Sequence, residues 1–411
     1  VFLDSRNGEL LALASRQGAG SARASVFTDP FEPGSTAKLF TAAALLTLRR
    51  VSEDDAVFAE GGLWRMPITS SGRTRVITDA HRTTGNLTLA RTIQVSSNIG
   101  MAKFSSRLSP EEQYEMLRDF GFGAPTGAEF PSESRGRLER PDKWEPMYTR
   151  ASVAMGYEFG VTPVQLAAAY GAIANKGVLL TPTLVREIRS VAGAPIYQHR
   201  PEPVRRVVTP AVAGQLREFL RGAASEGGTG EEAQLVNYTV LGKTGTAVRF
   251  ENGRYVHGTY TASFAALFPA DDPQLVVIVK IDNPRGKYYG GLTAAPVTRT
   301  MLQQALASRR LAIEHTRSAS RDHAVVQESL SRNPEPTPSR VVLSWPYHVP
   351  DTLPQEQPIP LVDGRPVREA TLALHRSGFR VNLKGFGRVS RTTPTGGETA
   401  KAGTTVVVWT E

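Results

Sequence analysis

The feature that most constrains the fold of this chain is a run of apolar and small residues over 39–48, Leu-Phe-Thr-Ala-Ala-Ala-Leu-Leu-Thr-Leu. A helix that is apolar on every side is buried on every side. The stretch that follows Thr162-Pro163 and reaches Ala174 has the same character. With 411 residues the chain is long enough for a sizeable core and for two or three domains. We therefore expect helices in the interior of a large domain.

Predicted strands lie near the two ends of the first 310 residues. Asn7-Gly8 supplies a turn signal between two short apolar runs at the start of the chain. A helical middle, in which Ser109-Pro110 is a well-formed helix start, separates them from later strands. This order predicts an α+β fold: one antiparallel five-stranded sheet built from both chain ends, flanked by helices, with a separate all-helical lobe. Helices are predicted over 88–107 and 293–311, and strands within 1–15 and over 238–241, 259–268 and 275–281.

The C-terminal part of the chain predicts a linker and a small separate module. Residues 308–357 are polar and rich in proline, which is typical of a linker. A helix is predicted over 365–377 with Gly378 as its stop, and alternating residues predict strands over 379–383 and 404–409. The predicted domains are 1–310, a linker over 311–356 and an α+β module over 357–411.

Composition excludes several kinds of site. The chain has no cysteine, which rules out disulfides, thiolate zinc sites and a cysteine nucleophile. The net charge is +9, but the basic residues are dispersed and no nucleic-acid motif accompanies them. We therefore expect a basic surface and no nucleic-acid partner. No motif indicates a metal or a cofactor.

The chain opens on Val1-Phe2-Leu3-Asp4, inside a predicted strand and without a leader. No stretch approaches the ~20 apolar residues of a membrane span. We expect the sequence to be part of a longer protein, with any signal or anchor upstream of it.

The first motif that carries chemistry is Ser35-Thr36-Ala37-Lys38, at the start of the predicted buried helix. A spacing of three places the Ser35 hydroxyl and the Lys38 amine on one face of a helix, and Gly34 permits a sharp turn into it. The helix dipole stabilises a serine alkoxide at the N-terminus, and a nearby amine can accept its proton. The motif predicts a serine nucleophile activated by lysine; the alternative is that Ser35 only caps the helix.

Two further motifs predict groups that face the same cleft. Ser96 and Asn98, two apart at a bend between helices, can direct a hydroxyl and an amide into it. Lys243-Thr244-Gly245-Thr246 continues a predicted edge strand, where Gly245 allows close backbone approach to a ligand. The lysine and the threonines can face a substrate carboxylate. Each motif alone is weak evidence. The pattern Ser-x-Asn also occurs elsewhere in the chain, in a predicted hairpin turn and in the predicted linker, where Ser and Asn need no further explanation.

In this order the three motifs resemble the signature Ser-x-x-Lys, Ser-x-Asn, Lys-Thr-Gly of penicillin-recognising enzymes. The context of Ser35, Glu-Pro-Gly-Ser-Thr-Ala-Lys-Leu-Phe-Thr, resembles the nucleophile region of class B penicillin-binding proteins. The resemblance covers about residues 1–310, and the tail over 357–411 is similar to a PASTA module, which implies peptidoglycan or β-lactam-like ligands. Further segments that resemble the class B family are 96–103, 156–166 and 288–292.

The resemblance implies a peptidoglycan D,D-transpeptidase that cross-links stem peptides through an acyl-enzyme at D-Ala-D-Ala. Ser35 would attack the carbonyl between the last two D-alanines, with Lys38 as its general base. Ser96 would relay a proton toward the leaving amine, and Asn98 would hold the substrate amide. Backbone N–H groups of Ser35 and Thr246 would form the oxyanion hole. The substrate-binding residues at the terminal carboxylate would be Lys243, Thr244, Gly245 and Thr246.

The family resemblance also implies a cellular location and binding partners. β-Lactams would inhibit the enzyme, and a terminal PASTA module resembles the septal, division-associated members. The implied partners are peptidoglycan stem peptides, β-lactams and proteins of the division or elongation machinery. The full-length protein would be anchored in the cell membrane by an N-terminal helix outside this sequence, with its catalytic domain on the extracytoplasmic (periplasmic or cell-wall) side.

Several alternatives use the same motifs. A D,D-carboxypeptidase and a β-lactamase both carry them, but class A β-lactamases add a loop glutamate that activates water. The nearest match, Glu232 to Asn237, is one residue off that pattern and lies only a few residues before Lys243. A bifunctional class A protein with an upstream glycosyltransferase also remains open. A non-catalytic β-lactam sensor or wall-binding receptor keeps the acylating residues, so turnover of a stem-peptide analogue has to separate it from an enzyme.

Overall fold

The computed structural model describes residues 1–16, 24–68, 72–251, 253–308, 356–385, 387–401 and 403–410. These residues form two compact units. The larger unit contains almost all described residues up to 308, and the smaller unit contains those from 356 onward. Each unit has its own hydrophobic core, so the two are described separately.

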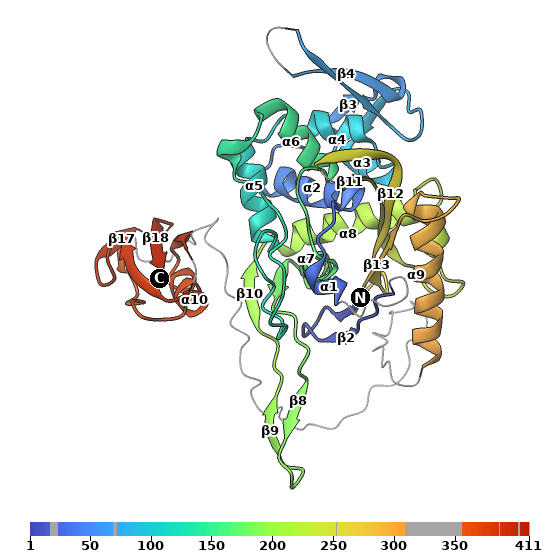
Figure 1. Ribbon diagram of the computed structural model, residues 1–411. Helices are drawn as coiled ribbons and strands as arrows, with labels where there is room; N and C mark the ends of the chain where they lie inside the picture. The colour runs from blue at the N-terminus through green and yellow to red at the C-terminus, as the bar shows by residue number, and fades with distance from the viewer. Residues whose placement is uncertain are drawn as a thin grey trace, which may run out of the picture. The chain divides into compact units, whose positions relative to one another are not determined.

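The larger unit is built on a five-stranded antiparallel sheet in the order β11-β12-β13-β1-β2 (Figure 1). The N-terminal strands extend the sheet beyond β13, with Leu3 opposite Val276. At the other edge lies β11, where Lys243 is opposite Ala265 of β12. The predicted sheet from both chain ends is confirmed, as is the edge position of the third motif. The strands are β1 (Phe2–Asp4), β2 (Leu10–Ala12), β11 (Leu241–Glu251), β12 (Arg254–Phe268) and β13 (Leu275–Asp282).

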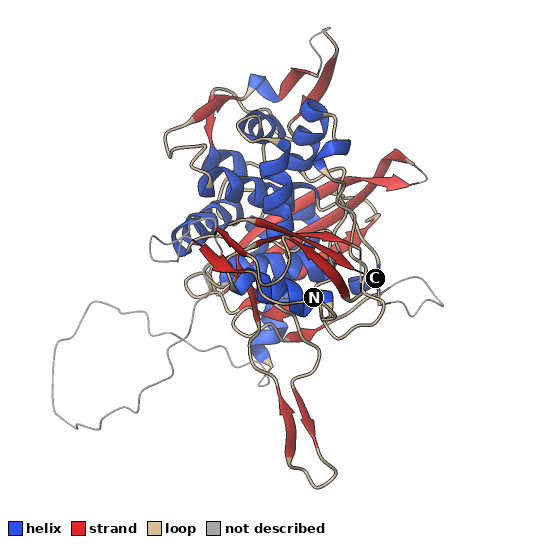
Figure 2. Ribbon diagram, turned by 90° about the vertical axis from the view of Figure 1, so that its left-hand side faces the viewer, coloured by secondary structure: helices blue, strands red, loops and turns tan. Residues whose placement is uncertain are grey.

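Helices cover both faces of this sheet (Figure 2). Successive residues of a strand point to opposite faces. On β13, Val276 faces α7 (Pro163–Ala174), where a Cβ atom on Gly171 would lie 3.9 Å from Val276 Cγ2. Its neighbour Val277 belongs to the buried core that includes residues of α9 (Gly290–Ala307). The predicted α7 helix is buried along its whole length.

The predicted buried helix is α2 (Lys38–Thr47), whose first eight residues are all buried. The Phe40 ring has its centroid 4.8 Å from that of Phe120, 4.9 Å from that of Phe122 and 5.8 Å from that of Tyr170. Aromatic rings thus surround the Phe40 side chain of α2. The other helices of this lobe and its boundary are α3 (Leu89–Gln94), α4 (Asn98–Ser105), α5 (Pro110–Asp119), α6 (Pro146–Met155) and α8 (Pro210–Ala224).

Two predicted elements differ in extent. The helical pattern over 88–107 forms two helices, α3 and α4, with a turn at 95–97 between them. The strand predicted over 238–241 begins only at Leu241. The N–H and C=O of Val240 are hydrogen-bonded to the side-chain amide of Gln234, so this residue does not pair with a neighbouring strand.

Short elements that the sequence did not indicate lie around the sheet and the helical lobe. Small two-stranded sheets pair β3 with β6, β4 with β5, β7 with β10 and β8 with β9. These strands are β3 (Ala56–Phe58), β4 (Leu63–Pro67), β5 (Thr74–Thr78), β6 (Asn86–Thr88), β7 (Val178–Leu180), β8 (Glu187–Arg189), β9 (Pro195–Gln198) and β10 (Pro203–Arg206). The short helices are α1 (Ser25–Thr28), η1 (Gly34–Ala37), η2 (Glu60–Gly62), η3 (Pro141–Lys143) and η4 (Glu231–Ala233).

The smaller unit packs one helix, α10 (Val367–Arg376), against strands. β15 pairs in parallel with β18, and β18 pairs antiparallel with β16. Gly378 ends α10 with a positive φ of 76°, as predicted. The core contains Leu374, Phe379 and Val406. The strands of this unit are β14 (Glu356–Pro358), β15 (Arg380–Lys384), β16 (Val389–Thr393), β17 (Thr399–Lys401) and β18 (Thr405–Thr410).

Two predictions fall largely on undescribed positions. The linker predicted over 311–356 lies outside the described residues except for Glu356, and so does the end of the helix predicted to reach 311. Among the residues that the structure describes, no helix is both long enough and apolar enough to cross a membrane.

Candidate active site

Ser35 lies in the one-turn 3-10 helix η1, which leads directly into α2. Residues i and i+3 of such a turn lie on the same side, so Ser35 and Lys38 share one face. Gly34 has a φ of 53°, and its N–H donates to Gly156 O at 3.0 Å. A Cβ atom on Gly34 would lie 3.2 Å from Thr246 O. The turn therefore fits tightly between the end of α6 and strand β11.

Lys38 is fully buried at the start of α2. Its Nζ donates to Ser96 O at 2.6 Å and to Asn98 Oδ1 at 2.7 Å, and lies 3.4 Å from Ser96 Oγ. Burial lowers the pKa of Lys38 to about 7, against the opposing effect of the Asp79 carboxylate, which raises it. Burial thus favours the neutral form of this amine, which is the form that can accept a proton.

Lys243 of β11 is also fully buried, and its Nζ donates to Ser96 Oγ at 2.9 Å. It lies 3.2 Å from Thr244 O and 3.3 Å from Thr244 Oγ1. The pKa of Lys243 is lowered well below its usual value, first by burial and then by the positive charge of Lys38. The Ser96 hydroxyl therefore lies between two buried amines. A hydroxyl both donates and accepts hydrogen bonds, so this arrangement can transfer a proton between them.

The turn that carries Ser96 is held by Asp79, a residue that the sequence analysis missed. Ser96 has a φ of 58°, an uncommon conformation for a residue other than glycine. Asp79 Oδ2 accepts from Ser97 Oγ at 2.6 Å, and its Oδ1 accepts from Asn98 N at 2.6 Å and Ile99 N at 3.1 Å. A carboxylate at the N-terminus of α4 also favours that helix electrostatically. No local pattern indicated Asp79, because its partners come from another segment.

Asn98 follows this turn as the first residue of α4. Its Oδ1 accepts from Lys38 Nζ, and its Nδ2 donates to Thr78 O at 2.9 Å. The structure thus places Asn98 beside Lys38, with both ends of its amide engaged by the protein.

The threonines of the third motif are held by neighbouring segments. Thr244 Oγ1 lies 2.6 Å from Thr229 Oγ1, and Thr246 Oγ1 accepts from Gly290 N at 3.0 Å. A Cβ atom on Gly245 would lie 2.2 Å from Ser263 Oγ and 2.8 Å from Pro33 O. The third motif predicts that Gly245 allows close backbone approach to a ligand. On the side where a side chain would project, the close neighbours are protein atoms, because Gly245 lies between the nucleophile turn and β12.

A buried carboxylate, Glu32, lies three residues before Ser35 and was quoted in the sequence analysis only as part of its motif. Glu32 Oε1 accepts from Glu158 N at 2.9 Å, from Tyr255 Oη at 3.0 Å and from Arg137 at 3.3 Å. Burial raises the pKa of Glu32. The carboxylate joins three segments that surround the nucleophile turn.

The predicted site residues therefore converge in space. Hydrogen bonds link Lys38, Ser96, Asn98, Lys243 and Thr244, and the turn with Ser35 packs against the backbone of Thr246. Two families match this chain. The family described as "Penicillin binding protein transpeptidase domain" matches residues 1–303, and the family described as "PASTA domain" matches residues 358–411.

Similar proteins agree with these matches. The chain is 33% identical over 319 residues to stage V sporulation protein D of Bacillus subtilis, covering 74% of this chain and 48% of that protein. It is 34% identical over 324 residues to the probable peptidoglycan D,D-transpeptidase PbpC of Pseudomonas aeruginosa, covering 76% and 54%. The chain spans about half the length of these curated relatives.

Solved structures of penicillin-binding proteins are also similar to this chain. The transpeptidase domain of Burkholderia pseudomallei penicillin-binding protein 3 superposes with a TM-score of 0.65 at 34% identity, covering 74% of this chain and 86% of that one. Penicillin-binding protein 3 from Mycobacterium tuberculosis, complexed with aztreonam, superposes with a TM-score of 0.66 at 30% identity, covering 76% and 73%.

The sheet, the helical lobe and the three motifs together define a penicillin-recognising serine acyltransferase fold. The chain belongs to the penicillin-binding protein transpeptidase family, its relatives are class B members, and it carries a PASTA domain at its C-terminal end. The resemblance stated from the motifs and the α+β fold expected from it are confirmed.

Proposed function

We propose that this chain catalyses D,D-transpeptidation of peptidoglycan stem peptides, with Ser35 as the nucleophile. The observation that carries the proposal is the position of the Ser96 hydroxyl, 2.9 Å from Lys243 Nζ and 3.4 Å from Lys38 Nζ. The match to the penicillin-binding protein transpeptidase family supports it. Its relatives PbpC and PenA are named as probable peptidoglycan D,D-transpeptidases.

In the first half-reaction, Ser35 Oγ attacks the carbonyl carbon between the last two D-alanines of a donor stem peptide. The hydroxyl proton goes to neutral Lys38, whose lowered pKa fits it for that role. The new bond joins Ser35 Oγ to the carbonyl carbon. N–H groups of Ser35 and Thr246 stabilise the oxyanion, a contribution of ~3 kcal/mol for each donor.

Collapse of this intermediate breaks the peptide bond to the terminal D-alanine. Ser96 Oγ gives its proton to the leaving amine. It then recovers a proton from Lys38 and Lys243 through its hydrogen bond with Lys243 Nζ. The terminal carboxylate is bound by Lys243, Thr244 and Thr246 of β11. Gly245 lies between the two threonines on this strand. An acceptor amine then attacks the ester, and Ser35 leaves with the proton.

Asn98 is proposed to hold the substrate amide. Its side chain is occupied by Lys38 and Thr78 in this structure, so substrate binding has to replace one of these bonds. The contact with Thr78 O is the exposed one of the two and is the one that we expect to exchange.

We also propose the wider setting of this activity. The domain division is 1–310, linker 311–356 and PASTA module 357–411. The enzyme is inhibited by β-lactams, which is supported by the relatives solved in complex with aztreonam and ampicillin. A septal role with division-machinery partners, and anchoring of the whole protein in the cell membrane with the catalytic domain extracytoplasmic, are proposed by analogy with class B relatives.

Labelled penicillin tests the nucleophile. We expect one covalent adduct at Ser35, mapped by mass spectrometry, and no adduct in Ser35→Ala. An adduct on another residue would overturn the assignment. We expect slow deacylation, so rapid turnover of nitrocefin would instead indicate a β-lactamase. A sensor would be acylated by penicillin but would not turn over a stem-peptide thioester in the presence of an amine acceptor.

A further inference from the structure

The hairpin of β4 and β5 lies beyond α4 and α6 at the outer end of the helical lobe (Figure 1). One of its faces is buried, since Met66 and Ile77 belong to a core cluster with Ile99 of α4 and Met155 of α6. Successive residues of a strand point to opposite faces, so the other face points away from this core. The residues of this outer face are all exposed: Leu63, Arg65, Pro67, Thr74, Val76 and Thr78.

The ladder of the hairpin shows which backbone groups point away from it. Backbone hydrogen bonds run from Asp79 N to Gly62 O and from Ile68 N to Arg73 O. Hydrogen-bonded and non-hydrogen-bonded pairs alternate along an antiparallel ladder. In this register Arg65 is in a non-hydrogen-bonded pair, and its N–H and C=O therefore point to the outer edge of β4.

The two outer edges of the hairpin differ. On β5, Thr78 O accepts from Asn98 Nδ2 at 2.9 Å, so this edge borders the candidate active site. On β4, no other described strand pairs with the outer edge. Leu63 N–H donates within the turn before β4, and Pro67 has no N–H. The open edge of β4 therefore offers one N–H, that of Arg65, and the carbonyl groups on either side of it.

Apolar and basic side chains lie together on the outer face. The side chain of Leu63 is 53% exposed and that of Val76 is 50% exposed. These two residues are diagonal neighbours across the two strands, and Arg65 lies directly opposite Val76. Contiguous exposed apolar side chains are typical of a surface that contacts a partner.

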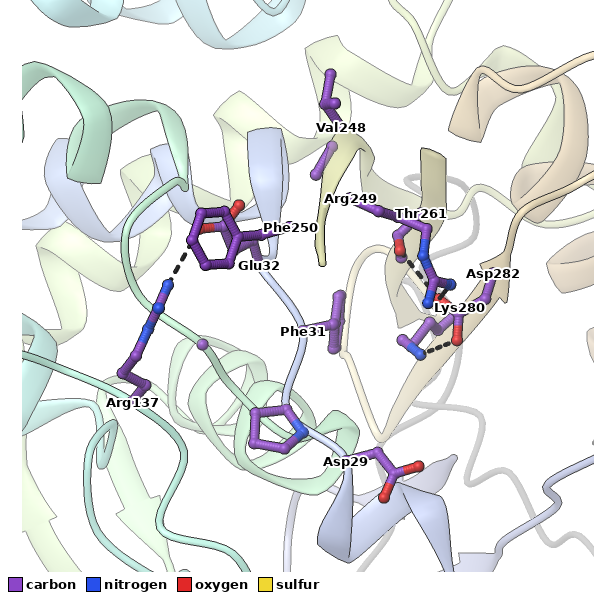
Figure 3. Close-up of a pocket in the computed structure, with 13 residues that line it drawn as sticks. Asp29, Phe31, Glu32, Arg137, Val248, Arg249, Phe250, Thr261, Lys280 and Asp282 are labelled. Atoms are coloured by element: carbon purple, nitrogen blue, oxygen red, sulfur yellow. Dashed lines mark hydrogen bonds and ion pairs between the residues drawn. The ribbon is translucent and has the colours of Figure 1, made fainter. Parts of the chain in front are cut away.

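The hairpin also carries an excess of positive charge. Residues 63–82 contain four arginines and one aspartate, a net charge of +3 with histidine neutral. The aspartate, Asp79, binds the N-terminus of α4. The cavity of about 400 Å³ beside the nucleophile turn differs, because ion pairs line it: Arg137 with Glu32, and Arg249 with Asp282 (Figure 3). The charge of the hairpin thus favours an acidic partner.

We propose that the open edge of β4 is a docking site for an extended acidic segment of a partner protein, which adds to the hairpin as a third strand. One residue of this segment exchanges two backbone hydrogen bonds with Arg65 and places a carboxylate beside its guanidinium group. The residues two positions before and after it lie beside Leu63 and Pro67 and are apolar. The segment therefore has an apolar, an acidic and an apolar residue at every second position.

Two other occupants fit this edge less well. A second copy of the chain would bring the same excess of positive charge, and two copies of Arg65 would repel each other across a symmetric edge. An anionic polymer or membrane surface would match the charge, but it would not use the peptide groups of β4. The open backbone edge therefore favours a peptide.

A fluorescently labelled peptide, Asp-Val-Thr-Glu-Thr-Val-Asp with blocked ends, tests the proposal by fluorescence polarisation with the whole chain. One control peptide has lysine in place of the central glutamate. A second control has an N-methyl group on that glutamate, which keeps the charge but removes the N–H that would donate to Arg65 O. The glutamate peptide is expected to bind about fivefold more tightly than either control.

Charge reversal on β4 locates the binding. Arg65→Glu should weaken binding of the glutamate peptide about fivefold and strengthen binding of the lysine peptide by a similar factor. Arg254→Glu, at an exposed position of β12, changes the net charge equally and should alter neither. The glutamate peptide should also slow hydrogen exchange at the Arg65 N–H. Penicillin acylation of both variants should equal that of the unaltered chain, because neither residue belongs to the candidate active site.

The outcomes decide between the occupants. Equal binding of the glutamate and lysine peptides, or no binding of either, would overturn the docking site. Equal binding of the glutamate peptide and its N-methylated form would overturn strand addition and leave a basic patch. Competition by phosphatidylglycerol vesicles or by soluble peptidoglycan fragments would then show whether a membrane or a wall polymer occupies it. Loss of peptide binding in Arg65→Glu with normal acylation supports the docking site independently of the proposed function.

Discussion

At the scale of single residues, the proposed chemistry depends on how Lys38 and Lys243 share their protons. Both amines are fully buried, and burial disfavours a charge on either. Repulsion between two positive charges this close is mutual, so protonation of one lowers the pKa of the other. Lys38 has the acceptors Ser96 O and Asn98 Oδ1 and the nearby Asp79 charge, which favour its protonated form in the free protein.

Substitution of Lys243 tests this coupling. In the proposed mechanism, a substrate carboxylate favours protonated Lys243, and this charge then keeps Lys38 neutral. Lys243→Gln removes that charge, so the pKa of Lys38 should rise and the acidic limb of the acylation–pH profile should move to higher pH. Lys243→Arg keeps the charge and should leave the limb in place. A lower rate at every pH with an unmoved limb in Lys243→Gln would show that burial and Asp79, and not Lys243, set the state of Lys38.

Asp79 should have the opposite effect. Its carboxylate raises the pKa of Lys38, so Asp79→Asn should lower that pKa and move the acidic limb to lower pH. The acylation rate at high pH should also fall about tenfold, because an amide replaces the acceptor for Ser97 Oγ and the N–H groups of Asn98 and Ile99. If the rate falls but the limb stays, Asp79 only positions the turn and has no electrostatic role.

At the scale of elements, the nucleophile turn is held where the end of α6 meets η1. Gly156 ends α6 with a φ of 91°, and its carbonyl accepts from Gly34 N. A Cβ atom on Gly156 would lie 1.9 Å from Gly34 O, which is backbone and cannot rotate away. The position thus requires glycine both for its conformation and for its neighbour.

Gly156→Ala should lower the free energy of unfolding by about 3 kcal/mol and reduce acylation, because η1 has to shift. Gly214→Ala within α8 is the matched control, since a Cβ atom there meets nothing within 4 Å. It should be neutral or stabilise the chain by ~0.5–1 kcal/mol. Urea unfolding of both variants measures this, and equal stabilities would contradict the close contact at Gly34.

At the scale of the whole molecule, the two compact units have separate cores. The strands and helices that carry all three motifs belong to the larger unit, and the core with Leu374, Phe379 and Val406 belongs to the smaller one. Domains with separate cores can fold separately. This organisation implies that acylation needs only the larger unit.

Deletion of 340–411 should therefore leave the rate of penicillin acylation within about threefold, because domains with their own cores fold independently. Circular dichroism and the unfolding transition of the truncated chain serve as the control for folding. Loss of acylation in a truncated chain that remains folded would show that the PASTA module contributes to the active site.

Local sequence patterns determined the elements whose causes are local. The apolar and small residues of α2 can only be buried, the capping box of Ser109 and Glu112 starts α5, and Asn7-Gly8 turns β1 into β2. Ser35 and Lys38 share a face for the same reason, since three residues of one turn separate them. The order of the motifs was sufficient to identify the family.

Only the tertiary structure decided how these parts meet. Ser96 lies 58 residues from Lys38 and 147 from Lys243, and Glu32 lies 223 from Tyr255. No pattern within a segment encodes such contacts, so Asp79 was missed, and so was the close packing of Gly245 against Ser263 and Pro33. The lowered pKa of Lys38 likewise arises from the exclusion of water by every element around it, a property of the assembled core that no single stretch of sequence contains.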